Sequence, residues 1–297
     1  MKIEDISVKG RLRANVELAN RTWFRVGGAA DWLFTPEDVN DLVLFLQALP
    51  LDISVTIMGV GSNLLVRDGG IEGVVIRLGR GFSEIKVSGC DVIVGAAALD
   101  VNVAKVASNA GLAGFEFLAG IPGTIGGAVR MNAGAYGSDI SQIATYIYAV
   151  DRAGREHKVA ASDADFAYRH CGLPDDWVIT KLAMRGELDN IYDINMRMEK
   201  IVSDRANTQP VRARTGGSTF KNTAGNKAWQ LIDKAGCRGL KYGDAQISEL
   251  HCNFMLNNGA ANANDLEHLG EQVRMMVLQK TGVELEWEIK RIGREID

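Results

Sequence analysis

The sequence has few residues of the kinds that build metal sites, disulfides or membrane anchors. Its four cysteines lie far apart without a Cys-x-x-Cys pair, and its four histidines have no ligand-like spacing with them. We therefore expect reduced thiols and no structural metal. No window is long and apolar enough to resemble a membrane span, and the N-terminal residues carry charges throughout. These absences predict a cytoplasmic protein with no membrane partner.

An excess of charge of one sign is also absent. The 297 residues carry a net charge of −4, with basic and acidic side chains interspersed. The sequence therefore has no strongly basic region, and nothing in its charge predicts binding to nucleic acid or to a lipid surface. Hydrophobic residues make up 46% of the chain and charged residues 24%, which is typical of globular proteins with an ample core. The length suits two domains or one large α/β body.

Glycine, in contrast, is concentrated in one stretch, with seven glycines between positions 114 and 137. Each glycine in a regular element costs about 0.5 to 1 kcal/mol relative to alanine, so this density is costly unless bare backbone is needed there. Bare backbone can approach a phosphate group or a flat ring closely. A set of tight turns between short strands is the structural alternative. The stretch alone leaves both interpretations open.

A second glycine motif lies between two predicted strands. Residues 53–78 are apolar and β-rich on either side of Gly59-Val60-Gly61-Ser62-Asn63. A strand followed by Gly-x-Gly is similar to a dinucleotide fingerprint, but Leu64 stands where the third glycine belongs and the next residues favour a strand over a helix. We therefore reject a Rossmann site. The turn amides and the Ser62 hydroxyl can still bind pyrophosphate.

The remaining pattern predicts further helices and strands. We expect a helix over 39–49 that is capped by Thr35, and a second body of the chain that begins near Leu188. A strand over 283–289 would direct Leu285, Trp287 and Ile289 to one side and Glu284, Glu286 and Glu288 to the other. The other expected elements are strands over 22–34 and 87–96, a hairpin over 145–159, a helix from 194 that Pro210 ends, and helices over 101–110, 228–235 and 264–280.

Five motifs together resemble those of the UDP-N-acetylenolpyruvoylglucosamine reductases. They are Gly59 to Leu65 (GVGSNLL), Gly120 to Gly137 (GIPGTIGGAVRMNAGAYG), Tyr168-Arg169, Gly217 to Asn222 (GSTFKN) and Leu285 to Glu288 (LEWE). They extend over nearly the whole chain, in the order of the family. The spacing after Tyr168-Arg169 is similar to that of the shorter, type II form of the family.

The resemblance implies an α+β fold with two domains. Residues 1–187 would form an FAD-binding domain of the vanillyl-alcohol-oxidase (PCMH) type, in two α+β subdomains over roughly 1–78 and 79–187. Residues 188–297 would form a smaller α+β substrate-binding domain, whose C-terminal strand carries Glu288 to the active site.

The resemblance also implies a reaction and its residues. The family reduces the enolpyruvyl ether of UDP-N-acetylglucosamine enolpyruvate to UDP-N-acetylmuramate, with NADPH as reductant and bound FAD as cofactor. This step belongs to peptidoglycan synthesis, and hence to cell wall biogenesis, cell shape and cell division. We expect a monomer whose partner is the enolpyruvyl UDP-sugar. The implied residues are Arg169, Ser218 and Glu288 for catalysis, Lys221 and Asn222 for substrate, and Gly59, Val60, Gly61, Ser62, Asn63, Leu64, Pro122, Gly123, Thr124, Gly126, Gly127, Ala128, Asn132, Ala133 and Gly134 for the cofactor.

The chemistry explains why such residues are needed. Reducing a C=C bond conjugated to a carboxylate takes a hydride at the β carbon and a proton at the α carbon, with enolate charge building between the two events. By resemblance, Arg169 and Glu288 hold the substrate carboxylate region and Ser218 gives the proton. From pattern alone, Arg169 is typical of a surface salt bridge, Glu288 of a solvated strand face and Ser218 of a turn.

Two positions depart from the family pattern, and two other function classes stay open. Cys171 stands where a serine is common and Thr223 where a proline is usual; neither is a catalytic position. A different flavin oxidoreductase would share the glycine-rich stretches without needing an acid at Ser218. A non-catalytic flavin-binding module would tolerate the loss of all three catalytic residues, and all three are present.

Overall fold

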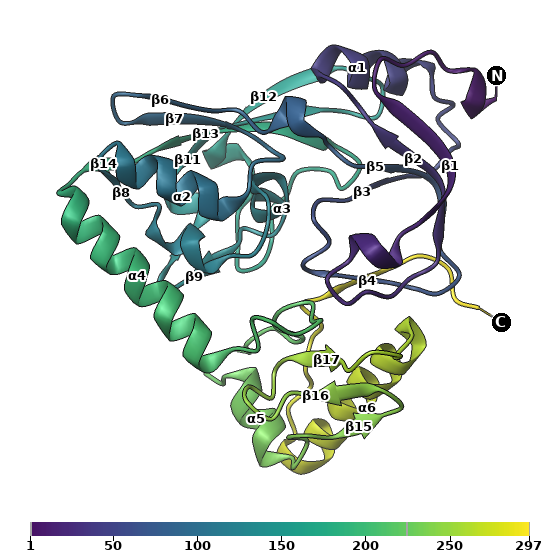
Figure 1. The fold of residues 1–297 in the computed structure, drawn as a ribbon, viewed down its shortest axis with the longest axis vertical. Coiled ribbons are helices and arrows are strands. Elements are labelled where there is room, and N and C mark those ends of the chain that lie inside the picture. Colours follow the sequence, from purple (N-terminus) through teal and green to yellow (C-terminus); the bar gives the residue numbers. More distant parts are fainter. Residues whose placement is uncertain (1, 224, 297) are drawn as a thin grey trace. The chain divides into compact units, whose positions relative to one another are not determined.

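The computed structural model describes residues 2–223 and 225–296 (Figure 1). They separate into two compact units, each built from several segments of the chain. Unit 1 consists of Met1–Ala14, Trp32–Gly59 and Gly73–Asp204, and unit 2 of Asn15–Asp31, Val60–Glu72 and Arg205–Asp297. The chain therefore passes more than once between the two units.

Four strands form a sheet in the order β1-β2-β5-β3: Arg11–Glu17, Ala29–Thr35, Ile71–Ile76 and Val55–Ile57. The last two strands are parallel, and α1 (Val39–Ala48) lies in the connection from β2 to β3. The helix buries Phe45, whose ring stacks on Phe34 with 4.0 Å between centroids. The predicted cap at Thr35 is wrong. The chain stays extended to Asp38, whose side chain accepts a hydrogen bond from the Asp41 N–H at 2.8 Å.

A five-stranded antiparallel sheet forms the centre of unit 1. Its strands are β12 (Glu156–Ala160), β11 (Ala144–Val150), β13 (Val178–Arg185), β7 (Asp91–Gly95) and β6 (Ile85–Ser88), in that order. Two helices, α2 (Asp100–Asn109) and α3 (Ile125–Arg130), cover one face of the sheet (Figure 1). Alternation along β7 buries Val92 and Val94 under them and exposes Ile93 between the two.

The glycine-rich stretch and its flanking residues form short elements that contribute to this core. These are β8 (Leu112–Ala113), which pairs with β14 (Glu187–Leu188), and then η4 (Glu116–Gly120), α3, β9 (Gly134–Ala135) and β10 (Ser138–Asp139). The long helix α4 (Ile191–Thr208) packs beside them through buried Ile194 and Ile201. Its Arg197 pairs with Glu116 at 2.7 Å. The other short helices are η1 (Ile3–Asp5), η2 (Ala19–Arg21), η3 (Arg80–Phe82), η5 (Ile140–Gln142) and η6 (Ala161–Asp163).

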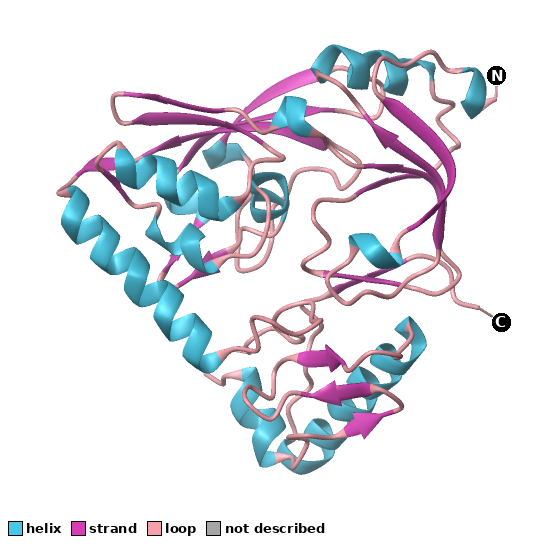
Figure 2. Ribbon diagram, in the orientation of Figure 1, coloured by secondary structure: helices cyan, strands magenta, loops and turns pink. Residues whose placement is uncertain are grey.

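Unit 2 packs two helices against a small sheet (Figure 2). The helices are α5 (Ala228–Lys234) and α6 (Ala263–Thr281), and the sheet order is β15 (Lys241–Tyr242), β16 (Ala245–Ile247) and β17 (Met255–Asn257). Leu266, Leu269 and Val273 recur at helical spacing on α6 and are fully buried. A further parallel pair joins β4 (Leu64–Val66) to β18 (Lys290–Ile292).

The helices and the hairpin predicted from the sequence are confirmed to within a few residues, but the strand predicted over 283–289 is wrong. Strand pairing begins only at Lys290, and the preceding segment is held by an isolated bridge between Phe220 and Trp287. The predicted alternation of burial is nevertheless present, since Leu285 and Ile289 are buried and Glu286 is exposed. Burial of alternate side chains thus does not require a continuous ladder.

Candidate active site

The predicted site residues fall into both units. Unit 1 contains Gly59, Pro122, Gly123, Thr124, Gly126, Gly127, Ala128, Asn132, Ala133, Gly134 and Arg169, and unit 2 contains Val60, Gly61, Ser62, Asn63, Leu64, Ser218, Lys221, Asn222 and Glu288. Within each unit, residues far apart in the sequence lie close together.

The turn before β4 is tied to the segment that carries Glu288. The side-chain amide of Asn63 donates a hydrogen bond to the Glu288 carbonyl oxygen at 3.0 Å, and the Asn63 carbonyl accepts one from the Lys290 N–H at 3.1 Å. The same turn is held from its other side, where the Gly61 carbonyl accepts a hydrogen bond from the Trp23 N–H at 3.1 Å. Gly61 has a φ of 70°, which favours glycine. The Asn63 side chain therefore ties the predicted cofactor turn to the backbone of the residue that carries the predicted catalytic carboxylate.

Ser218 lies on a segment that crosses beside Glu288. The Thr219 carbonyl, one residue beyond Ser218, accepts a hydrogen bond from the Glu288 N–H at 2.8 Å. Two residues further on, the Lys221 N–H donates to the Glu286 carbonyl at 2.8 Å. These bonds set the register between the two segments. The predicted acid and the predicted carboxylate therefore lie on neighbouring segments of the chain.

Bare glycine backbone allows this segment to approach its neighbours. A Cβ on Gly216 would lie only 2.4 Å from the Phe24 ring. Gly217 has a φ of +81°, and a Cβ there would lie 3.9 Å from the Ser62 carbonyl oxygen. The close approach to Phe24 thus requires glycine at 216 and the positive φ favours glycine at 217, and Ser218 follows a residue at ordinary contact distance from the predicted cofactor turn.

The predicted substrate residues already have partners within unit 2. Lys221 forms an ion pair with Glu286, whose side chain is 71% exposed. The Asn222 side-chain oxygen accepts a hydrogen bond from the Ala228 N–H, at the start of α5, at 3.0 Å. Lys221 thus offers a cation whose ion-pair partner, Glu286, is exposed to solvent. The Asn222 side chain, in contrast, holds the backbone at the start of α5.

In unit 1, Arg169 is tied to the end of the glycine-rich stretch. It lies at the tip of a turn closed by the reciprocal backbone hydrogen bonds of Ala167 and His170, and its φ of 55° is unusual for a residue with a side chain. Its guanidinium donates to the Gly134 carbonyl at 3.1 Å. The buried Asn132 side chain joins the same two segments, because it donates to the Ala167 carbonyl at 3.1 Å. The sequence motifs at 120–137 and 168–169 therefore meet in space.

The middle of the glycine-rich stretch offers backbone for a cofactor. Thr124 bridges to Leu99, and the Gly126 N–H donates to the Ala96 carbonyl at 2.9 Å. A Cβ on Gly59 would lie 2.9 Å from the Thr124 hydroxyl oxygen, so the two predicted cofactor motifs meet there. Gly127 is exposed, and a Cβ there would find its nearest neighbour at 3.9 Å. The close contact between Gly59 and Thr124 and the exposed backbone of Gly127 are suited to a flavin dinucleotide, because bare backbone can approach a phosphate group or a flat ring.

Comparison with known proteins identifies the family. Residues 30–160 match the FAD binding domain and residues 209–292 match the C-terminal domain of UDP-N-acetylenolpyruvoylglucosamine reductase. A UDP-N-acetylenolpyruvoylglucosamine reductase from Parvibaculum lavamentivorans is 57% identical over 286 residues, which make up 96% of this chain and 92% of the relative. This chain belongs to the UDP-N-acetylenolpyruvoylglucosamine reductase family. The reductase from Gluconobacter oxydans is 58% identical over 97% of this chain and 94% of its own.

A solved structure of the reductase family agrees. The crystal structure of UDP-N-acetylenolpyruvylglucosamine reductase from Thermus caldophilus has a TM-score of 0.84 and 33% identity, and covers 95% of this chain and 99% of that one. The predicted family, the α+β fold class and the assignment to the FAD-containing reductases are therefore confirmed.

Three nearby residues were not found by sequence reasoning. Asn253 is buried, and its side chain forms two hydrogen bonds with the backbone of Phe220. It accepts one from the Phe220 N–H at 3.0 Å and donates one to the Phe220 carbonyl at 2.9 Å. Arg77 donates to the Gly59 carbonyl at 3.3 Å. Asp100 lies buried beside Gly123. None belongs to a glycine-rich motif, so their positions follow only from the fold.

The two departures from the family pattern, Cys171 and Thr223, each have a local structural role. Cys171 is buried in the unit 1 core, and burial raises the pKa of its thiol. Thr223 exchanges backbone hydrogen bonds with Asn226. Across residues 2–223 and 225–296, no three metal-ligating side chains come together, and no helix is long and apolar enough to cross a bilayer.

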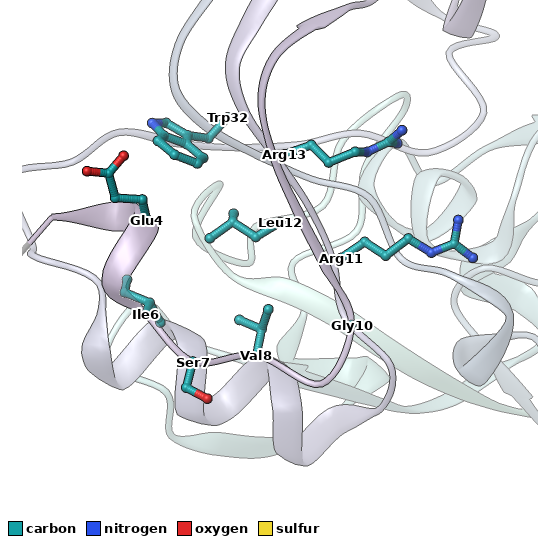
Figure 3. Close-up of a pocket in the computed structure, with 9 residues that line it drawn as sticks. All are labelled: Glu4, Ile6, Ser7, Val8, Gly10, Arg11, Leu12, Arg13 and Trp32. Atoms are coloured by element: carbon teal, nitrogen blue, oxygen red, sulfur yellow. The ribbon is translucent and has the colours of Figure 1, made fainter.

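A separate pocket of about 600 Å³ lies near the N-terminus in unit 1 and contains none of the predicted site residues (Figure 3). Ile6, Val8, Leu12 and Trp32 contribute apolar walls. Arg11 and Arg13 extend away from Leu12 and Trp32 on the far side of β1 (Figure 3). The pocket therefore has no convergent charged groups of the kind that fix a polar ligand.

Proposed function

We propose that this chain reduces the enolpyruvyl ether of UDP-N-acetylglucosamine enolpyruvate to UDP-N-acetylmuramate in peptidoglycan synthesis, with NADPH as reductant. The observation that carries the residue assignments is the arrangement in unit 2. Gly217 lies against the Ser62 carbonyl, and Glu288 is bonded to Asn63. These contacts bring the backbones of the residues that we assign as acid and carboxylate, Ser218 and Glu288, close to the turn that we assign to FAD.

Bound FAD supplies the hydride for the β carbon of the substrate. The residues of this chain have the other tasks. Ser218 holds its hydroxyl toward the α carbon and donates the proton there, while Arg169 and Glu288 orient the substrate carboxylate and the charge that builds on it. A serine is a very weak acid, so alignment of the donor matters more than its pKa.

The substrate requires a local cation, because the chain as a whole has a net charge of −4. We assign Lys221 to the diphosphate of the UDP-sugar and Asn222 to the same part of the substrate. Lys221 is suited to this role because its ion-pair partner Glu286 faces solvent and can be displaced.

We assign residues 1–187 to FAD binding and residues 188–297 to substrate binding. The FAD-binding match lies within the first range and the reductase C-terminal match within the second. We further propose that the protein is a cytoplasmic monomer. We also propose that it binds no nucleic acid, since charges of both signs are interspersed along the sequence.

The direct test is NADPH oxidation by the purified protein with and without the enolpyruvyl UDP-sugar. We expect turnover only with the sugar, and loss of turnover in Ser218→Ala. Ser88→Ala, which changes an exposed serine on β6, is the matched control and should retain full activity. NADPH oxidation that is independent of the sugar would favour a different flavin oxidoreductase. Flavin binding without turnover would favour a binding module.

A further inference from the structure

Asn253 is a buried residue whose side chain contacts the segment that carries Ser218. It is 4% exposed, and both polar ends of its amide group are hydrogen-bonded to Phe220. The side-chain oxygen accepts from the Phe220 N–H at 3.0 Å, and the side-chain nitrogen donates to the Phe220 carbonyl at 2.9 Å. The amide thus offers Phe220 the same donor and acceptor that the backbone of a neighbouring strand would offer.

The backbone at 253–254 is bonded to the preceding part of the same segment. The Thr219 N–H donates to the Asn253 carbonyl at 2.8 Å. Ser218 itself forms an isolated antiparallel bridge with Phe254. Through its carbonyl and its side chain, Asn253 therefore holds both of the residues that directly follow Ser218.

The segment at 218–221 is also bonded to residues 286–288. The Thr219 carbonyl accepts from the Glu288 N–H, and the Lys221 N–H donates to the Glu286 carbonyl, each at 2.8 Å. The two backbone polar groups of Phe220, in contrast, are bonded by the Asn253 side chain. Phe220 is 1% exposed, so loss of that amide would leave a buried N–H and a buried carbonyl without these partners. The backbone next to Ser218 would then lose its fixed position.

We propose that Asn253 is a positioning residue for the reaction, whose side-chain amide fixes the segment after Ser218 and so keeps the Ser218 hydroxyl aligned with the substrate. The proposal rests on the proposed function, because it takes Ser218 as the proton donor. Asn253 acts through the backbone of Thr219 and Phe220. Because alignment decides how well a weak acid donates, a displacement of about 1 Å typically costs about 100-fold in rate.

The test uses the two protonation states of Asn253→Asp. A protonated carboxyl has a donor and an acceptor, as the amide has, so it can form both hydrogen bonds with Phe220. An ionised carboxylate only accepts, so the Phe220 carbonyl loses its donor and repels the charge. Burial should bring this ionisation toward the neutral range, so rates are measured between about pH 6 and pH 9.

Anaerobic stopped-flow absorbance measures two steps separately. They are bleaching of the flavin by NADPH and return of the absorbance on adding the enolpyruvyl UDP-sugar. His251, whose ring contacts the Asn253 N–H at 3.4 Å, and Glu286 and Glu288 on the neighbouring segment also titrate. These groups are common to variant and wild type, so each rate is divided by the wild-type rate at the same pH.

The return step should respond to the substitution and the bleaching step should not. In Asn253→Asp we expect return at close to the wild-type rate at the acidic end of the range, and about ten- to a hundredfold slower return as the carboxyl ionises. Asn253→Ala loses both hydrogen bonds at every pH and should be slow throughout. Ser108→Ala, at a buried position of unit 1 that bonds Asn195, is the control and should lower the melting temperature without changing either step. If Asn253→Ala does not fold, Asn253→Asp alone decides.

Combination with Ser218→Ala separates positioning from general damage. If Asn253 acts through Ser218, its substitution should slow the return step much less in the Ser218→Ala background than in wild type. A wild-type return rate in the Asn253 variants at every pH would overturn the role of Asn253. Equal slowing of both steps, or the same slowing with and without Ser218, would also overturn it. NADPH oxidation by the wild-type protein that is independent of the sugar would overturn the proposed function itself.

Discussion

The side chain of Asn63 donates a hydrogen bond to the backbone carbonyl of Glu288, 3.0 Å away and 225 residues later in the sequence. Asn63 belongs to the turn that we assign to FAD, and Glu288 is the carboxylate that we assign to catalysis. One amide group therefore ties the turn that we assign to FAD to the backbone of the residue that we assign to catalysis, within unit 2.

The first prediction concerns this coupling. Asn63→Ala leaves the Glu288 carbonyl without its side-chain donor, at a cost of about 1 to 3 kcal/mol. Because that bond positions Glu288, we expect kcat to fall about tenfold with a smaller change in FAD content. Asn258→Ala, at an exposed position of the same unit, is the control and should leave kcat unchanged. An Asn63→Ala variant with normal kcat would show that Glu288 is positioned by other contacts.

The second prediction concerns the ion pair between Lys221 and Glu286. If Lys221 binds the substrate diphosphate, Glu286 competes with the substrate for the same cation. Glu286→Gln should therefore lower KM for the UDP-sugar, by up to about fivefold for a surface pair, and Lys221→Ala should raise it, both with little change in kcat. Glu284→Gln, in the same segment but paired with Arg274, is the control. A large loss of kcat at constant KM in Lys221→Ala would instead assign Lys221 to the chemistry.

The third prediction concerns acid stability and Asp151. Burial of this carboxylate opposes ionisation, but hydrogen bonds from Arg155 and His157 outweigh it and lower the pKa to about 2 from 3.8. Because the folded-state pKa lies below the unfolded-state value, the ionised group stabilises the fold above pH 4, by about 2 kcal/mol. That stabilisation is lost as the pH falls from about 4 to about 2.

Chemical denaturation between pH 7 and pH 3 tests the role of Asp151. The free energy of unfolding of Asp151→Asn should lie below that of wild type at pH 7, and the difference should shrink toward pH 3. Asp175→Asn changes a carboxylate that is 89% exposed and should show no such difference. A constant gap between wild type and Asp151→Asn at all pH values would contradict the assignment.

Much of the fold could be predicted from the sequence because its signals are local. The helical spacing of Leu266, Leu269 and Val273 predicted α6, and the turn at 151–154 predicted the β11–β12 hairpin. The strand expected over 283–289 failed for a physical reason. Alternation of apolar and polar residues indicates which side chains are buried. A strand also needs a neighbouring backbone that pairs with it in register over several residues. In this segment Trp287 has only an isolated bridge.

The site could be predicted in part. The glycines at 216–217 indicated a close approach, and the structure shows that Gly216 makes it, against the Phe24 ring. Glu288 carries no signal of its own, since it alternates with other glutamates, and only the family resemblance predicts a role for it. Asp100 could not be found, because a single aspartate at the start of a helix is typical of a favourable helix dipole, and its burial depends on packing by distant segments.

The central claim is that Ser218 gives the proton to the substrate. Transfer of hydride from NADPH does not involve Ser218, so bleaching of the flavin absorbance by NADPH should proceed in Ser218→Ala at close to the wild-type rate. Return of the absorbance on adding the enolpyruvyl UDP-sugar should slow by about 10²- to 10⁴-fold, the usual loss for a positioned proton donor. Ser218→Cys should recover part of this rate, because a thiol of similar shape can still donate.

Anaerobic stopped-flow absorbance with Ser218→Ala, with Ser88→Ala as the control, measures the two steps separately. Our account predicts a normal first step and a slowed second step in Ser218→Ala alone. Equal slowing of both steps would show a structural Ser218, and an unimpaired second step would contradict the account by removing Ser218 from the reaction.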